Sequence, residues 1–528
     1  MEDQIRLLEL YPGREEANIH ARLRHYAIDS APAYTAISYR WRSKNPLRAI
    51  HLDEMRFFAR ENLVNLLQCL RDPHQSRMLW IDAICVNQSD NEERSSQVQK
   101  MGLIYSRAET VISWLDLQGE GTLRRASDLL SAPSLWRYID FRKGRENSHE
   151  SWEALQQVMT HEYWTRTWII QEIITAERVM VQSGLFAMPL SLLEDFAYWI
   201  MVRNNQSKGI HADWEGIATA NCIQLCEHRI AVSCRLNPRQ PLQHLLMRYG
   251  NFNCTDPRDK VYSLLDISIQ LDHPITVDYA GTSAWLFAEV LSCLHASEEM
   301  GPKEVVGTAA LLYKHLLCGY PSDAERRKAV RAVQRTSSFQ VEPYHRGFIA
   351  SAGLLDEPLQ LRRLRKQAAG MRMFSSHMSE FPHGWADFPD VHNAPLFQPE
   401  ELHGFAVQAS PVGSIIQAHT TSFGLAGFPV RDGDRIYQFS NTDFALVVRS
   451  AERYHGLGSK AANKIVGPAL LTGPVGTAQW NPFIKSTDVA SWFRSFEPQP
   501  LNLLGDSVSS SSITIVELFD LISWVCRS

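Results

Sequence analysis

The first 60 residues contain four short stretches in which apolar and polar positions alternate. Side chains at every second position of an extended chain share one face, so this alternation predicts strands with one buried face. The stretches are residues 5–10, 22–28, 34–41 and 48–53. We therefore expect the chain to begin with a β-sheet.

The pattern changes after Asn62, where four leucines between residues 63 and 70 share one helical face and Pro73 ends the helix. Residues 78–84 and 110–115 are almost continuously apolar, which is typical of strands covered on both faces. Between them, Ser89 or Asp90 can cap a second helix. This order of strand, helix and strand predicts a doubly wound parallel sheet with right-handed crossovers.

The rest of the chain divides by composition. Residues 117–163 are polar with helical spacing and read as an insertion, 164–177 as a helix and 178–184 as a strand. We expect five regions: an α/β domain at 1–185, a helical region at 186–300, a helical and loop region at 301–403, a β-rich region at 404–506, and a Ser-rich linker with a terminal helix at 507–528.

Charge and cysteine content restrict the function classes. The formal net charge is −5 over 528 residues, which gives no electrostatic case for a nucleic-acid partner. No window approaches the roughly 18 apolar residues that a membrane-spanning helix needs, and the N-terminus lacks the pattern of a secretory signal. Nine cysteines, an odd number in a long chain, favour free thiols in a reducing compartment. We expect a soluble cytoplasmic protein.

Polar side chains gather where the first and second buried strands end. In open parallel sheets, ligands bind at the carboxyl ends of the strands, so these side chains are candidates for lining a ligand cleft. The candidates are Ser38, Tyr39, Arg40 and Arg42 after one strand and Asp82, Cys85, Asn87 and Gln88 after the other. The alternative is that Asp82 and Asn87 bond the backbone of a tight turn and that Cys85 only packs, since a nucleophilic thiol needs a base and no histidine lies nearby in sequence.

Residue types that can ligate a metal lie close together in sequence at Cys222, Cys226, His228 and Cys234. The spacing lacks the Cys-x-x-Cys knuckle of structural zinc sites, and buried thiols in a helical region explain it as well. We expect no metal site there.

Four blocks of the N-terminal region together resemble the fungal heterokaryon-incompatibility (HET) domain. They are YTAISYRW, the Asn62 helix, LWIDAICVNQSDNEERSSQVQKMGLIYSRAETVISWLD and WTRTWIIQE, within residues 34–177. Residues 255–267 and 275–279 resemble the helical region that commonly follows this domain. The resemblance implies a role in non-self recognition between fungal strains and in the cell death that follows. This chain departs from the family in one place, with Arg42 where a glycine usually stands.

The HET family is also distantly similar to Toll/interleukin-1 receptor-type (TIR) domains, which have a flavodoxin-like fold. Trp168 and Glu172 match the Trp-x-x-x-Glu spacing of TIR domains that cleave NAD. The resemblance implies that Glu172 is the catalytic residue, that NAD is a substrate and that no resident cofactor is required. A carboxylate can stabilise the oxocarbenium-like transition state of such a cleavage. The insertion at 117–163 separates this helix from the preceding strand.

Three functions are compatible with the sequence. The first is a HET effector of cell death, triggered by self-association and regulated by the rest of the chain. The second is an enzyme of a fungal secondary-metabolite pathway that uses the same cleft, because some HET proteins lie near such genes. The third is a non-catalytic interaction module with protein partners.

Overall fold

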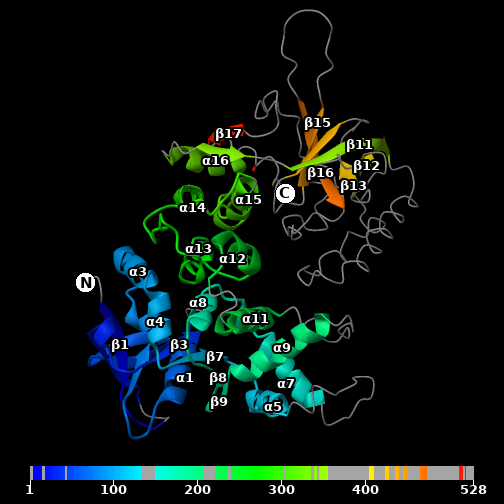
Figure 1. The fold of residues 1–528 in the computed structure, drawn as a ribbon. Coiled ribbons are helices and arrows are strands. Elements are labelled where there is room, and N and C mark those ends of the chain that lie inside the picture. Colours follow the sequence, from blue (N-terminus) through cyan, green and yellow to red (C-terminus); the bar gives the residue numbers. More distant parts are fainter. Residues whose placement is uncertain are drawn as a thin grey trace, which may run out of the picture. The chain divides into compact units, whose positions relative to one another are not determined.

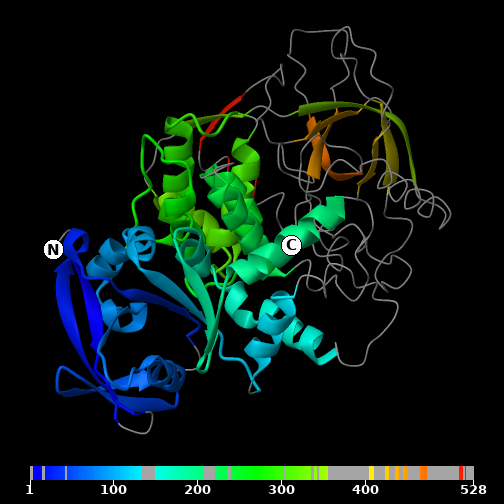
Figure 2. The same ribbon diagram turned by 60° about the horizontal axis from the view of Figure 1, so that its bottom comes forward.

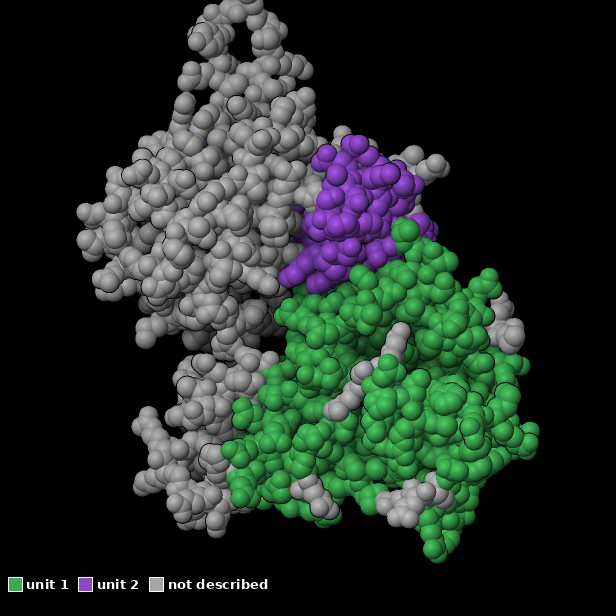
Figure 3. Space-filling model, turned by 180° about the vertical axis from the view of Figure 1, so that it is seen from behind, with its two compact units in different colours: residues 1–270, 275–282 green, residues 271–274, 283–528 purple. Residues whose placement is uncertain are grey.

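The computed structural model describes most of the first 333 residues and isolated segments beyond them. The described residues are 4–14, 18–41, 45–119, 121–132, 149–205, 220–234, 239–302, 304–333, 338–341, 344–354, 403–408, 422–426, 434–438, 444–449, 464–472, 511–514, 518 and 522. The chain divides into two compact units, coloured separately in Figure 3. Unit 1 is Met1–Gln270 with Ile275–Thr282, and unit 2 is Leu271–Pro274 with Ser283–Ser528.

Unit 1 is built on a nine-stranded sheet in the order β5-β4-β2-β1-β6-β3-β7-β8-β9 (Figure 1). The strands are β1 (Gln4–Leu10), β2 (His20–Ala27), β3 (Thr35–Tyr39), β4 (Leu47–Leu52), β5 (Met55–Arg60), β6 (Arg77–Trp80), β7 (Thr110–Trp114), β8 (Val179–Ser183) and β9 (Phe186–Pro189). Four adjacent strands, β6, β3, β7 and β8, run parallel. This confirms the predicted α/β class.

The sheet as a whole is mixed, so the expectation of a parallel sheet holds only for its central strands. β1 pairs antiparallel with β2 and β6, and β4–β5 and β8–β9 are hairpins. A turn of two residues can join only antiparallel strands. In the β4–β5 turn, Asp53 and Glu54 have φ values of 49° and 67°, the left-handed backbone that such hairpin turns require.

Helices cover both faces of the parallel strands. In Figures 1 and 2, α4 lies on one side of the sheet and α1 on the other. The helical elements of unit 1 are η1 (Ile28–Ser30), α1 (Glu61–Leu70), α2 (Asp82–Cys85), α3 (Asn91–Val98), α4 (Met101–Arg107), α5 (Thr122–Leu130), α7 (His149–Met159), η3 (Glu162–Thr165), α8 (Ile169–Ile174), α9 (Ser191–Asn205), α11 (Asn221–Ser233), α12 (Leu242–Tyr249), α13 (Asp259–Tyr262) and η5 (Leu265–Ile267). Because both faces are covered, the side chains of Ala36, Ile37 and Val111 are at most 1% exposed.

Two helix predictions can be compared directly with the structure. Asp90 caps α3, because its Oδ1 atom accepts hydrogen bonds from the backbone N–H groups of Glu92 and Glu93 at 3.0 and 3.1 Å. The single helix expected over 164–177 is instead two short elements, η3 and α8. Extended backbone at Arg166 separates them, and this break places Arg166 between the two.

The described part of unit 2 includes three helices with defined bounds, two β structures and the helical positions Leu518 and Ile522. The helices are α14 (Ser283–Ala296), α15 (Val305–Leu316) and α16 (Asp323–Ala332). A two-stranded sheet joins β10 (Ser338–Val341) to β17 (Ser511–Thr514). A closed barrel has the order β11-β12-β13-β16-β15-β14, formed by β11 (Tyr344–Leu354), β12 (His403–Gln408), β13 (Ser422–Ala426), β14 (Arg435–Gln438), β15 (Phe444–Arg449) and β16 (Lys464–Thr472).

The strands of unit 2 extend beyond the region where the sequence placed them. Five barrel strands lie in or at the edge of the predicted β-rich region, whereas β10 and β11 lie where helix and loop were expected. Residues Ser511–Thr514, expected as linker and helix start, form β17. Within the described residues, no helix combines the length and the apolar character that crossing a bilayer requires.

Candidate functional site

The central strand β3 lies between β6 and β7, so the chain passes to opposite sides of it in successive crossovers. Such a reversal is the place where ligands bind in open α/β sheets, beyond the carboxyl ends of the strands. Ser38 near the end of β3 is the register partner of Ser113 near the end of β7. The two hydroxyls therefore mark this reversal point.

A chain of hydroxyl groups connects these strands to Glu172 on α8. The Ser38 Oγ donates a hydrogen bond to the Oε2 atom of Glu172 and also contacts the Tyr163 hydroxyl. The Tyr163 hydroxyl donates to the Oγ atom of Ser113 at 2.9 Å. All four side chains are buried, and Glu172 is only 2% exposed. The geometry thus places a carboxyl group in the protein interior with hydroxyl partners.

Burial raises the pKa of Glu172 from its ordinary value of 4.5 to about 7, because removal from water disfavours the charged form. The Arg166 guanidinium and the Ser38 hydrogen bond lower that pKa, while the negative charge of Asp82 raises it. Near neutral pH, Glu172 therefore populates both its protonated and its ionised form. A carboxyl group with such a pKa can exchange protons during a reaction.

Arg166 forms an ion pair with Glu172 and interacts electrostatically with Asp82. Its Nη1 atom lies 3.7 Å from the Oε2 atom of Glu172. Burial lowers the pKa of Arg166, but the negative charges of Glu172 and Asp82 raise it, and the net pKa lies above the ordinary value. Among the described residues, this Nη1 atom has no hydrogen-bond partner although it is buried. Arg166 supplies the positive charge that a buried pair of acids needs.

Asp82 and Tyr39 belong to the same cluster. The Oδ1 atom of Asp82 accepts hydrogen bonds from the Trp41 indole at 3.3 Å and from the backbone N–H of Ala83 at 2.7 Å. Burial raises the pKa of Asp82, and the positive charge of Arg166 opposes that rise. The pKa of Tyr39 is raised by burial and by Asp82, and its buried hydroxyl has no hydrogen-bond partner among the described residues. The fold thus gathers Ser38, Tyr39, Asp82 and Glu172.

The part of the chain that carries this cluster is similar to known proteins. Residues 34–172 match the family model described as heterokaryon incompatibility protein (HET). The chain contains a HET domain. Heterokaryon incompatibility protein 6, OR allele, from Neurospora crassa is 36% identical over 125 residues, which is 21% of this chain and 18% of that protein. The chain therefore aligns with less than a fifth of this relative's length. No solved structure matches the chain.

The remaining candidates of the HET domain after the second buried strand are Cys85, Asn87 and Gln88. Cys85 is buried, and the other two bond within the turn between α2 and α3. Cys85 is 1% exposed, and burial raises the pKa of its thiol to about 12, which keeps it protonated and disfavours a nucleophilic role. The backbone N–H of Asn87 donates to the Oε1 atom of Glu93 at 2.8 Å, and its own Oδ1 accepts from the backbone N–H of Ser89 at 3.2 Å. Gln88 donates to the carbonyl oxygen of Asp82 at 3.1 Å. These contacts correspond to the alternative of turn chemistry.

Two arginines at the end of the first strand, Arg40 and Arg42, were also predicted to line the cleft. Arg40 is exposed and forms an ion pair with Glu162 of η3. Arg42 lies outside the described residues.

His228, one of the four residues considered above as metal ligands, forms a hydrogen bond between its Nδ1 atom and the Tyr249 hydroxyl at 2.6 Å. In the described part of the chain, no three metal-ligating side chains come together.

Sequence reasoning missed Arg166, Tyr163 and Ser113 as members of the cluster. Arg166 lies inside the WTRTWIIQE block, two residues before Trp168, and Tyr163 immediately precedes that block. Their closeness to Glu172 in sequence was the available signal. Ser113 carried no signal, because only its pairing with Ser38 across the sheet brings it to the site.

Proposed function

We propose that this protein acts in fungal non-self recognition, with the HET domain as the effector of cell death. Support comes from the HET domain itself and from the relative whose name is that of an incompatibility protein. The second part of this proposal is chemical: Glu172 is the catalytic carboxylate of a reaction that cleaves NAD.

In the proposed reaction, water replaces nicotinamide at the anomeric carbon of the adjoining ribose. The carbon–nitrogen bond breaks, its electron pair leaves with neutral nicotinamide, the water oxygen bonds to carbon, and one proton is released. Ionised Glu172 would stabilise the oxocarbenium-like transition state. Two features support the analogy with TIR domains: the Trp168-x-x-x-Glu172 spacing and the strand order β6-β3-β7-β8, which corresponds to the start of the flavodoxin-like order 2-1-3-4-5.

One observation carries this proposal. Glu172 is a buried carboxyl group with a pKa of about 7, held by Ser38 and Arg166 where the strand order reverses. Perturbed carboxyl groups at such positions are characteristic of functional sites. Because Glu172 is 2% exposed, a substrate can touch it only in a more open state than the one described.

The direct test is incubation of the full chain with NAD and measurement of released nicotinamide by chromatography. We expect Glu172→Gln to reduce the rate by at least about 100-fold, because the amide cannot stabilise positive charge. Glu227→Gln is a matched control, since Glu227 also lies 3.7 Å from an arginine, Arg248, on other helices. Equal rates in wild type and Glu172→Gln, or no release from wild type, would rule out cleavage at this residue.

The cellular part has a separate test. Expression of the full chain in a fungal host is expected to arrest growth, and Glu172→Gln is expected to relieve the arrest. Arrest of the same strength with Glu172→Gln would support a role in cell death without NAD cleavage. Normal growth with both proteins at equal abundance would contradict the effector role.

A second candidate function is a non-catalytic interaction module. The burial of the cluster favours it, because Ser38, Tyr163, Ser113 and Glu172 are linked to one another by polar contacts in the interior. A buried polar network of this kind can specify a fold without any chemistry. The NAD experiment separates the two candidates.

A further inference from the structure

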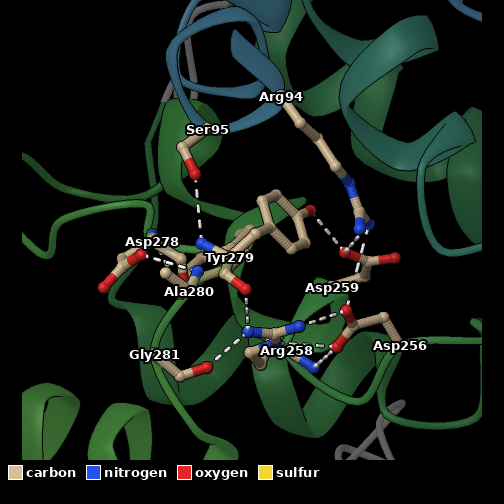
Figure 4. A network of polar contacts seen from close by, with 10 residues as sticks. Arg94, Ser95, Asp256, Arg258, Asp259, Asp278, Tyr279, Ala280 and Gly281 are labelled. Atoms are coloured by element: carbon tan, nitrogen blue, oxygen red, sulfur yellow. Dashed lines mark hydrogen bonds and ion pairs between the residues drawn. The ribbon is translucent and has the colours of Figure 1, made fainter. Parts of the chain in front are cut away.

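Two segments that lie about 160 to 190 positions later in the chain, residues 256–259 and 278–281, contact the helix α3 of the HET domain (Figure 4). We call these two segments the clasp. The Arg94 guanidinium lies 3.5 Å from the centre of the Tyr279 ring and 3.8 and 3.9 Å from carboxylate oxygens of Asp259 and Asp256. The Tyr279 hydroxyl donates to the Oδ1 atom of Asp259 at 2.6 Å. The backbone N–H of Tyr279 donates to the Ser95 Oγ atom at 3.0 Å.

Arg258 connects the two parts of this clasp. Its Nε and Nη2 atoms donate to the two carboxylate oxygens of Asp256 at 2.9 and 2.7 Å. Its Nη1 atom donates to the carbonyl oxygens of Tyr279 and Gly281. Bidentate pairing and carbonyl contacts of this kind fix an arginine in one orientation. Residues 256–259 and 278–281 therefore behave as one polar assembly.

Two aspartates of this segment also contact α8 or the residue before it, close to Glu172. Asp259, besides its contact with Arg94, interacts with the side chain of Trp168, and this interaction lowers the pKa of the Asp259 carboxyl group. Asp266 accepts a hydrogen bond from the backbone N–H of Gly102 on α4 at 3.0 Å and another from the side chain of Gln171. Each aspartate thus ties a helix of the HET signature, α3 or α4, to a residue at most four positions from Glu172.

The segment that carries these aspartates continues directly into unit 2. Residues 271–274, between Asp266 and Tyr279, belong to unit 2, and the backbone N–H of His273 donates to the Ser297 Oγ atom there at 3.1 Å. Two residues after Gly281, unit 2 resumes with α14. The clasp is therefore covalently joined to unit 2 on both sides of Tyr279.

We propose that Asp259 and Asp266 hold α8 in the closed position that buries Glu172, and that loss of these contacts opens the site. Only the expected effect on nicotinamide release rests on the proposed function. Contacts that exist in the closed state and not in the open state shift the population toward the closed state. In the described state Glu172 is closed off, so the contacts of Asp259 and Asp266 act as an autoinhibitory brace.

Hydrogen–deuterium exchange of the full chain tests the brace without reference to catalysis. We expect Asp259→Asn and Asp266→Asn each to raise the exchange of residues 166–174 by about 10-fold or more, because each loses charge-assisted hydrogen bonds. Chemical labelling of Glu172 by a carbodiimide is expected to rise in parallel. Asp72→Asn is the control, since Asp72 accepts two backbone hydrogen bonds in a turn after α1. Unchanged exchange of 166–174 in both variants would overturn the proposal.

Further variants guard against general loss of structure. Gly102→Ala should act like Asp266→Asn, because an added Cβ atom would lie 2.6 Å from the Asp266 Cγ atom. Arg94→Lys keeps the positive charge and should give a smaller rise in exchange than Arg94→Gln. Exchange in β3 and β7 should stay at the wild-type level in all of them. If it rises together with that of α8, the effect is unfolding and the brace is refuted.

Nicotinamide release then separates the two proposals. Greater exchange with greater release supports both the brace and the catalytic role of Glu172. Greater exchange with no release from any variant supports the brace and refutes NAD cleavage. Greater exchange with reduced release refutes autoinhibition, because the contacts then serve to position the site.

Discussion

Ser38 donates a hydrogen bond to the carboxyl group of Glu172, which lies 134 positions later in the chain. The donor is on the central strand of the sheet, and the acceptor is on a short helix beyond the 117–163 segment. The bond links the two blocks at the limits of the HET match, which runs from residue 34 to residue 172. Its effect on the protonation of Glu172 can be measured.

Replacement of Ser38 by alanine removes this donor. The Ser38 hydrogen bond lowers the pKa of Glu172, so we expect that pKa to rise by roughly one unit in Ser38→Ala. Ser113→Ala is the control, because Ser113 bonds Tyr163 and not Glu172. Difference infrared titration of the protonated carboxyl band, with Glu172→Gln as the reference, measures the midpoint. A midpoint that moves equally in both serine variants would contradict the assignment.

Glu172 should make the folded state less stable as pH rises. Its pKa is about 7 in the fold against an ordinary 4.5, so between these values the folded state binds more protons than the unfolded state. Its favourable contribution is complete below pH 4.5 and lost by about pH 7, on the order of 3 kcal/mol in total. The difference in melting temperature between wild type and Glu172→Gln should follow this course. A difference that is constant from pH 4 to pH 8 would refute it.

Arg166→Met should leave Glu172 protonated at neutral pH, because the nearby positive charge that lowers its pKa is gone. Removal of one member of a buried ion pair costs about 3 kcal/mol or more. The variant Arg166→Met/Glu172→Gln should be less destabilised than the sum of the single variants, since the unpaired acid is also removed. Thermal unfolding of the four proteins gives the coupling. Simple additivity would show that the 3.7 Å pair has no net interaction.

Cys85 should resist alkylation in the native protein. A buried thiol with a pKa of about 12 has almost no thiolate near neutral pH, so its reaction with iodoacetamide should be roughly 1,000-fold slower than that of exposed Cys234. Mass spectrometry of peptides after native and denaturing labelling provides the measurement. Cys85→Ala should release nicotinamide at a rate within about twofold of wild type. Rapid native labelling of Cys85 would restore it as a nucleophile candidate.

Local patterns predicted the elements around β3 because their burial is written in consecutive residues. The apolar run at 110–115 became β7, and the leucines after Asn62 became the buried face of α1. The run at 78–84 became β6 only as far as Trp80, because Asp82–Cys85 form the short helix α2. The hairpins β1–β2, β4–β5 and β8–β9 made the sheet mixed, and strand direction depends on turn geometry rather than on alternation. The helix expected at 164–177 was interrupted at Arg166, which forms a parallel β-bridge with Asn253, and the backbone N–H of Thr167 donates to the Asn253 carbonyl oxygen at 2.9 Å.

The sequence by itself determined the HET assignment, the α/β class and Glu172 as the residue of greatest interest, because motif order and hydrophobic period are local properties. Only the tertiary structure decided that Ser38, Tyr39 and Asp82 join Glu172 while Asn87 and Gln88 stabilise a turn. It also added Arg166, Tyr163 and the brace aspartates Asp259 and Asp266. The reason is physical: desolvation and charge pairing, which set the pKa of Glu172, arise from residues brought together across the sheet and the later segment.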